Sequence, residues 1–225
     1  MTDTADALPP VQSPALPADS AELATYIAAK LCHDFVSPAG AIMSGLDLLN
    51  DPSAQDMRDD ALGLITDSAA KMIALIHYCR VAFGAATSSE RFTAAELKGL
   101  IEGMIKGGRA TMDWRVSETD FDKPIARALS NLAYLTVGAL ASGGVATVAS
   151  RREGDLLILT GLAEGARARL KPEALVGLSG QRLTEGLAGQ WVQPYWLWLN
   201  VKEAGGQLVV VAEEGRVAIE ARFRQ

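Results

Sequence analysis

Two long amphipathic segments at the start of the chain constrain its fold most. Apolar residues recur every three to four positions through residues 20–50 and again through residues 53–83, the period of a helix with one buried face. Between the segments, Asn50, Asp51 and Pro52 are typical of a tight turn. Two helices of about 30 residues joined by a short turn are antiparallel neighbours. The two apolar stripes comprise Leu23, Ile27, Leu31, Phe35, Ile42, Leu46 and Leu49 in the first segment, and Met57, Ala61, Leu64, Ile65, Met72, Ile76, Cys79 and Phe83 in the second.

A hairpin of two such helices has too little core to be stable alone, because each helix buries only one side against the other. A two-fold dimer that forms a four-helix bundle solves this problem. Small residues in the first segment (Ala39, Gly40, Ser44 and Gly45) would let the helices approach closely. We therefore expect residues 20–84 to be a dimerisation domain, with a helix start at Ser20 after the capping pair Asp19 and Glu22.

His33 lies on the first segment, two residues from both Leu31 and Phe35. At about 100° per residue it points roughly 200° away from each, so its side chain is expected to face solvent. An exposed imidazole is a nucleophile that titrates near neutral pH. Spacing alone also allows a plainer interpretation, an exposed histidine beside an ordinary helix kink at Pro38. The other histidine, His77, is expected to be structural.

The composition changes after residue 89. Residues 1–19 are rich in proline and are expected to form a disordered arm, and residues 84–89 a flexible linker. From residue 90 to 225 the pattern predicts a helix, a strand, a helix, two strands, two helices and two strands. Thr93 with Glu96 is a capping box, and Pro124 suits a helix start. Hairpin-joined strands with interspersed helices predict a mixed sheet with helices on one face, so the whole chain is α+β, a helical hairpin followed by a two-layer α/β sandwich.

Charge and hydropathy exclude some function classes. The formal net charge of −6 and the pI near 5.0 argue against a nucleic-acid partner, which would require a basic face. No apolar run approaches the roughly 20 residues needed to cross a bilayer, and no signal peptide is evident. Cys32 and Cys79 are expected to be small core residues of a reducing compartment, which makes the cytoplasm the expected location.

Residues 33–38, His-Asp-Phe-Val-Ser-Pro, resemble the H-box of bacterial histidine kinases, which reads His, acid, apolar, any residue, small polar, Pro. In that family the histidine carries the phosphoryl group and the acid orients or deprotonates it, which implies these roles for His33 and Asp34. Residues 131–144 match the length and phase of the kinase asparagine box. Leu135 stands where the magnesium-binding asparagine would be, and residues 160–165 lack the adenine-binding aspartate. Because leucine offers no oxygen ligand, the domain is expected to keep the kinase fold without the nucleotide.

A histidine-bearing dimeric hairpin followed by a degenerate ATPase-like domain resembles the ChpT-type histidine phosphotransferases of bacterial phosphorelays. The resemblance implies that His33 takes a phosphoryl group from the receiver aspartate of a CckA-like hybrid kinase and passes it to CtrA-like and CpdR-like regulators. The receiver would supply magnesium, and the chain would need no cofactor of its own. Expected docking residues are Phe35, Ser37, Ala41, Ile42 and Ser44 around the histidine, with Arg167, Arg169 and Glu173 in the second domain. An active kinase with a divergent ATP site and an inert receiver-binding scaffold remain as alternatives.

Overall fold

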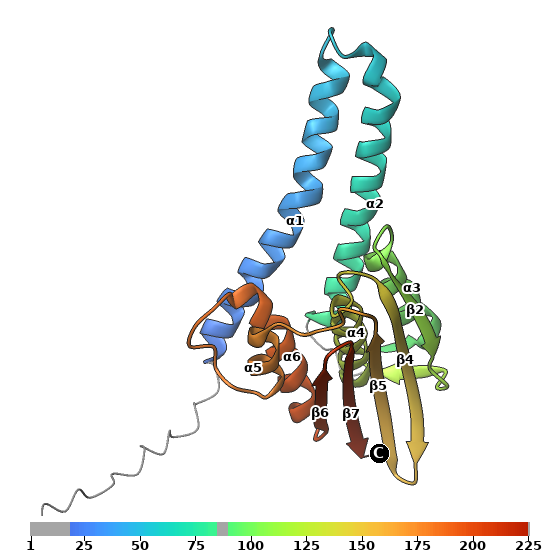
Figure 1. Ribbon diagram of the computed structural model, residues 1–225, viewed down its shortest axis with the longest axis vertical. Helices are drawn as coiled ribbons and strands as arrows, with labels where there is room; N and C mark the ends of the chain where they lie inside the picture. The colour runs from blue at the N-terminus through green and yellow to red at the C-terminus, as the bar shows by residue number, and fades with distance from the viewer. Residues whose placement is uncertain (1–18, 85–89, 225) are drawn as a thin grey trace, which may run out of the picture.

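The computed structural model describes residues 19–84 and 90–224 of the 225-residue chain. A helical hairpin projects from an α/β body, with the hairpin base packed on that body and its tip extending away (Figure 1). The expected arm, apart from Asp19, and most of the expected linker lie outside the described residues.

The hairpin is built from α1 (Ser20–Asn50) and α2 (Arg58–Ala82). The predicted start of α1 is confirmed: Asp19 caps it by accepting a hydrogen bond from the backbone N–H of Ala21. The predicted start of the second helix, at residue 53, is wrong by five residues. Asp51 accepts hydrogen bonds from the backbone N–H and the hydroxyl of Ser53, and a short 3₁₀ turn, η1 (Gln55–Met57), precedes α2. A side-chain turn therefore replaces the first helical turn here.

The helix α2 is apolar on two faces rather than on one. Ala61, Ser68 and Leu75 are buried against the rest of the molecule. Ile76, which the sequence pattern placed on the same buried stripe, is instead 50% exposed, as Ile73 is at 53%. The single stripe predicted for this helix therefore mixed two faces.

The α/β body follows the predicted order, with one addition. Its elements are β1 (Arg91–Thr93), α3 (Ala94–Ile105), β2 (Ala110–Arg115), β3 (Asp120–Asp122), α4 (Lys123–Gly138), β4 (Gly144–Glu153), β5 (Leu156–Glu164), α5 (Pro172–Leu178), α6 (Ala188–Glu203), β6 (Gln207–Glu213) and β7 (Arg216–Arg224). Within the described residues, a five-stranded sheet has the order β2-β4-β5-β7-β6, with β2 and β4 parallel and the other pairs antiparallel. The added element is the antiparallel ribbon of β1 and β3.

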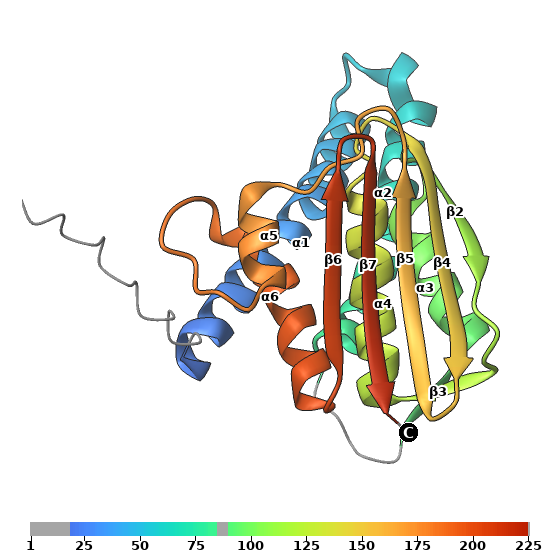
Figure 2. The ribbon, with the colours of Figure 1, turned by 60° about the horizontal axis from the view of Figure 1, so that its bottom comes forward.

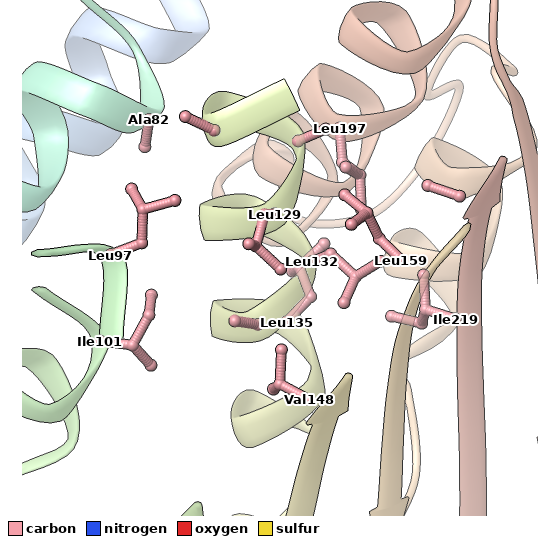
Figure 3. Close-up of a cluster of buried hydrophobic side chains, with 14 of the residues drawn as sticks. Ala82, Leu97, Ile101, Leu129, Leu132, Leu135, Val148, Leu159, Leu197 and Ile219 are labelled. Carbon is pink, nitrogen blue, oxygen red and sulfur yellow. The ribbon is translucent and has the colours of Figure 1, made fainter. Parts of the chain in front are cut away.

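Helices cover one face of this sheet and the other face is open, which confirms the predicted two-layer mixed sandwich (Figure 2). The helix α4 lies at the centre of the core, between α3 and the sheet (Figure 3). Leu129 and Leu132 of α4 pack with Leu97 of α3 and Leu159 of β5, and all four side chains are fully buried. Gly161 of β5 permits this packing, because a side chain there would collide with Thr136 of α4.

The hairpin base is joined to the body by buried polar and aromatic contacts. Gln193 of α6 donates to the hydroxyl of Tyr78 on α2 at 2.6 Å and to the side-chain oxygen of Asn131 on α4 at 3.2 Å. The indole of Trp196 donates to the carbonyl of Ala82 at 2.6 Å. On the other side, Leu23 of α1 packs into a cluster of α6 aromatic residues. These contacts fix the direction in which the hairpin leaves the body.

Candidate functional site

The predicted exposure of His33 is confirmed. Its side chain lies on α1 and is 89% exposed. The helix continues without interruption through Pro38, whose side chain is buried against the molecule. The imidazole is therefore presented to solvent from a rigid helix rather than from a loop, which makes it accessible to a partner protein.

Asp34 links His33 to the body. One carboxylate oxygen lies 3.3 Å from Nδ1 of His33, and the other accepts a hydrogen bond from Nζ of Lys30 at 2.7 Å. Lys30 is itself 10% exposed and lies over the ring of Tyr134, 5.9 Å from its centroid. A carboxylate held in this way favours the tautomer with the proton on Nδ1. The lone pair on Nε2 is then free to act as a nucleophile.

A cleft of about 300 Å³ lies beside His33, between the hairpin and helices α3 and α4. Burial raises the pKa of Tyr134, which forms part of its wall. The cleft is lined by His33, Asp34, Ser37, Pro38, Lys71, Leu75, Met104 and Tyr134. Sequence reasoning found the members from residues 33–38 but missed Lys71, Leu75, Met104 and Tyr134, which come from distant segments. Lys30 was also missed, although its spacing of four residues from Asp34 was a signal for an ion pair on one helix face.

The predicted docking residues on α1 divide between two sides of the helix. Ser37 lines the cleft, and Ser44 is exposed. Ala41 is half-buried, as are Phe35 and Ile42, which belong to the apolar stripe opposite His33. At the period of the helix, Ser37, Ala41 and Ser44 lie within about 80° of His33, whereas Phe35 and Ile42 point nearly the opposite way.

The predicted docking residues of the body lie apart from the cleft. Arg167 and Arg169 are exposed and line a different hollow, of about 380 Å³, beside the β6–β7 turn. Glu173 accepts a hydrogen bond from the backbone N–H of Leu187 at 3.2 Å. Backbone N–H groups, its own and that of Leu187, hold the pKa of Glu173 below its usual value. Glu173 therefore has a local role in holding the segment that leads into α6.

The two cysteines differ from each other. Cys32 is exposed, so its predicted core position is wrong. Cys79 is half-buried, and burial raises the pKa of its thiol to about 11.

The second histidine of the hairpin lies away from the cleft of His33. His77 is exposed and lines a separate cavity with Arg80 and Glu96.

The described residues contain neither a metal-binding cluster nor a membrane-spanning helix. Residues 19–84 and 90–224 contain no cluster of three or more His, Cys, Asp or Glu side chains arranged to hold a metal ion. In the same ranges, no helix has both the length and the apolar character needed to span a membrane.

Comparison with known proteins gives concordant results. The chain is 28% identical over 205 residues to the protein phosphotransferase ChpT of Brucella abortus (strain 2308), a match that covers 89% of this chain and 95% of that protein. A solved structure described as a bacterial phosphotransferase superposes with a TM-score of 0.80 at 25% identity, covering 93% of this chain and all of the other. Residues 94–216, more than half of the 225, match the family model of the histidine phosphotransferase C-terminal domain. The chain therefore belongs to the ChpT-type histidine phosphotransferase family.

Proposed function

We propose that the chain is a phosphorelay shuttle in which His33 receives a phosphoryl group from the aspartate of a receiver domain and delivers it to the aspartate of a second one. The observation that carries this proposal is the pairing of an almost fully exposed His33 with a carboxylate fixed at its Nδ1. Covalent capture on the protein divides the overall transfer into two easier steps.

The geometry supports the following course of transfer. The Nε2 lone pair of His33 attacks the phosphorus of the aspartyl phosphate, a nitrogen–phosphorus bond forms, and the phosphorus–oxygen bond breaks with its electron pair leaving on the receiver carboxylate. The proton stays on Nδ1, so the phosphorylated ring carries a positive charge. Asp34, 3.3 Å away, stabilises that charge and is in turn held by Lys30. The same steps in reverse order load the second receiver.

The body uses its kinase-like residues for packing, which supports a function without ATP. Asn131, the first residue of the asparagine-box segment, is fully buried and donates to the carbonyls of Ala82 and Arg127. Leu135 belongs to the hydrophobic core. In the loop after β5, Ala168 is buried and the N–H of Arg169 donates to the carbonyl of Ala139 at the end of α4. We propose that the magnesium needed for transfer comes from the receiver and that this chain holds no cofactor.

The exposed apolar residues of the hairpin support a homodimer. Ile73 and Ile76 continue one face of α2, while Val36 and Met43 lie seven residues apart on α1. Large aliphatic side chains so concentrated on a helical pair mark an interface. We propose that a second copy covers this face and completes a four-helix bundle, as the hairpin pattern predicts.

We propose a cytoplasmic location and partners of the receiver type, a CckA-like hybrid kinase upstream and CtrA-like and CpdR-like regulators downstream. The net charge of −6 suits neither a nucleic acid nor an anionic membrane as a partner. The docking site includes the exposed side of α1 around Ser37 and Ser44.

The test uses a hybrid-kinase receiver domain whose aspartate carries radiolabelled phosphate. We expect the wild type to acquire acid-labile label within seconds to minutes and His33→Ala to acquire none. His77→Ala is the matched control, because His77 is also an exposed hairpin histidine but lies outside the cleft, and it should be labelled like the wild type.

Two other outcomes would replace the proposal. Labelling of the wild type by ATP alone would make the chain a histidine kinase. Binding to the receiver that survives His33→Ala, with no label on any variant, would make it a scaffold.

A further inference from the structure

Lys71 shares a cleft with His33 and could reach a phosphoryl group attached to the imidazole. It lies on α2 and lines the same cleft of about 300 Å³ as His33 and Asp34. Of the described residues that line this cleft, Lys71 is the only lysine or arginine. Its α2 position faces the histidine from the second helix of the hairpin, so the cleft has the nucleophile on one wall and a cation on another.

The other lysine near the site is already engaged. Lys30 is nearly buried, donates to Asp34 at 2.7 Å and lies over Tyr134. Lys71, by contrast, is exposed and makes no hydrogen bond or ion pair with any residue in the described ranges. A lysine with a free ammonium group on a flexible four-carbon chain can follow a group that moves between donor and acceptor.

The chemistry at His33 calls for such a cation. A phosphoryl group on Nε2 brings up to about two negative charges next to a cleft that already contains the Asp34 carboxylate. Phosphoryl transfer is accelerated mainly by positioning and by neutralising charge on the transferred oxygens. Asp34 serves the ring nitrogen and cannot serve the phosphoryl oxygens, since like charges repel.

We infer that Lys71 is a catalytic residue whose ammonium group contacts the phosphoryl oxygens during transfer to and from His33. The inference rests on the proposed shuttle function. The receiver supplies the groups around its own aspartate, and Lys71 supplies a positive charge from the side of this chain. Proton and electron bookkeeping are unchanged from the transfer described above, because Lys71 acts as a charge and not as an acid or base.

The experiment measures single-turnover transfer from a phosphorylated receiver domain to the full chain over a range of receiver concentrations. The variants are Lys71→Met, Lys71→Gln and Lys71→Arg. We expect Met and Gln to lower the saturating rate constant about 10–100-fold with little change in the half-saturating concentration, and Arg to restore most of the rate. The side chain is exposed and unpaired, so far-UV circular dichroism and the thermal midpoint should stay at wild-type values.

Lys106→Met is the matched control. Lys106 lines two neighbouring hollows together with Lys71 but does not line the cleft of His33. Its saturating rate constant should equal that of the wild type. An equal loss in both Met variants would attribute the effect to general positive charge and would overturn the inference.

The result also separates this inference from the shuttle itself. If the wild type accepts phosphate and Lys71→Met accepts it at the same saturating rate, Lys71 has no catalytic role and the shuttle stands. A change confined to the half-saturating concentration would make Lys71 a docking residue and would likewise overturn its catalytic role. If the wild type accepts no phosphate from the receiver, the shuttle fails, and the inference about Lys71 fails with it.

Discussion

The base and the tip of the hairpin are stabilised in different ways. At the base, Trp191 and Tyr195 of α6 enclose Leu23, and Tyr78 joins the buried polar chain through Gln193. Toward the tip, α1 and α2 pack against each other and against η1, closely enough at Gly45 that an added Cβ would lie 2.6 Å from a side-chain carbon of Ile65. Eight large apolar side chains of the described hairpin remain exposed: Val36, Met43, Leu46, Met57, Leu62, Leu64, Ile73 and Ile76. The base is covered within one chain, whereas the rest of the hairpin leaves apolar side chains exposed that the proposed second copy would cover.

His33 lies between these two regions, and its position explains why both are needed. It follows the segment of α1 that packs on α6, so the body fixes where the imidazole is held. It lies before Gly45 and the tip of the hairpin, and its side chain is 89% exposed, so no described residue covers it. The proposed shuttle would have to present His33 to one receiver and then to another. A helix face that is exposed above a base packed on the body suits that role.

The largest expected effect comes from removing the main aromatic side chain of the base. Trp191 is fully buried, stacks on Tyr195 at 4.5 Å, and donates its indole N–H to the carbonyl of Gln181. Trp191→Ala should lower the free energy of unfolding by about 3–5 kcal/mol, measured by urea denaturation. Leu187→Ala, at a side chain that is 62% exposed just before α6, should change it by less than about 0.5 kcal/mol. Equal effects would mean that the base is not the stabilising junction.

The next effect concerns the exposed face of α2. Carboxylates at positions 73 and 76 would face solvent in a single chain, because Ile73 and Ile76 are about half exposed there. In a dimer that covers these positions they would be buried without a partner, which costs free energy. The double variant Ile73→Asp/Ile76→Asp should therefore weaken the dimer at least about 100-fold, which is about 2.7 kcal/mol, and leave the folded monomer intact. Light scattering after gel filtration should change from roughly twice 23.8 kDa to about 23.8 kDa.

The control for the dimer is a pair of equally exposed apolar residues elsewhere. Val209 and Val211 lie on the edge strand β6 and are exposed to a similar degree. Val209→Asp/Val211→Asp should remain dimeric. Dissociation of this control alone would place the dimer contact away from the hairpin, and a monomeric wild type would overturn the proposed dimer.

A third effect, smaller again, concerns the close approach of the two helices. Gly45→Ala adds a methyl group against Ile65 and the carbonyl of Ala61. The crowding should outweigh the better helix propensity of alanine and cost about 1–2 kcal/mol. Gly63→Ala, which meets no atom within 4 Å, should instead raise stability by about 0.5–1 kcal/mol. If both substitutions stabilise the protein, the helices are not in tight contact at Gly45.

Local signals in the sequence predicted most of the fold. The caps at Asp19 and Thr93 and the helix start near Pro124 depend on neighbouring residues alone, and all three were located correctly. The ribbon of β1 and β3 was missed because strands of three residues show no alternation. The start of α2 was placed too early because Asp51 forms a side-chain turn that a helical pattern does not reveal.

The site was predicted only where it is local. Helical phase gave the exposure of His33, and the motif gave its neighbour Asp34. Lys71, Met104 and Tyr134 reach the same cleft from α2, α3 and α4, and nothing in their own surroundings marks them. The interpretation of α2 as a helix with one apolar face failed for a related reason. Its sequence contains two apolar stripes with the same helical period, one buried and one exposed, and the pattern alone does not separate them.

The smallest expected effect is a loss of stability at alkaline pH. It is tested by comparing Cys79, at the base of the hairpin, with Cys32, just before His33. Burial raises the pKa of Cys79 from 9.0 to about 11 in the folded protein, so the unfolded chain loses this proton first as the pH rises. The stabilising effect of the protonated thiol is therefore complete below pH 9 and is lost as the pH rises to about 11. Because Cys79 is only half-buried, we expect a loss of stability under about 1 kcal/mol, seen as a lower urea midpoint at pH 10.5 than at pH 8.

The controls are two alanine variants. The urea midpoint of Cys79→Ala should fall less between these pH values than that of the wild type, and the midpoint of Cys32→Ala should fall as much. An unchanged fall in Cys79→Ala would assign the alkaline sensitivity to Tyr78 and Tyr134, whose pKa values burial also raises.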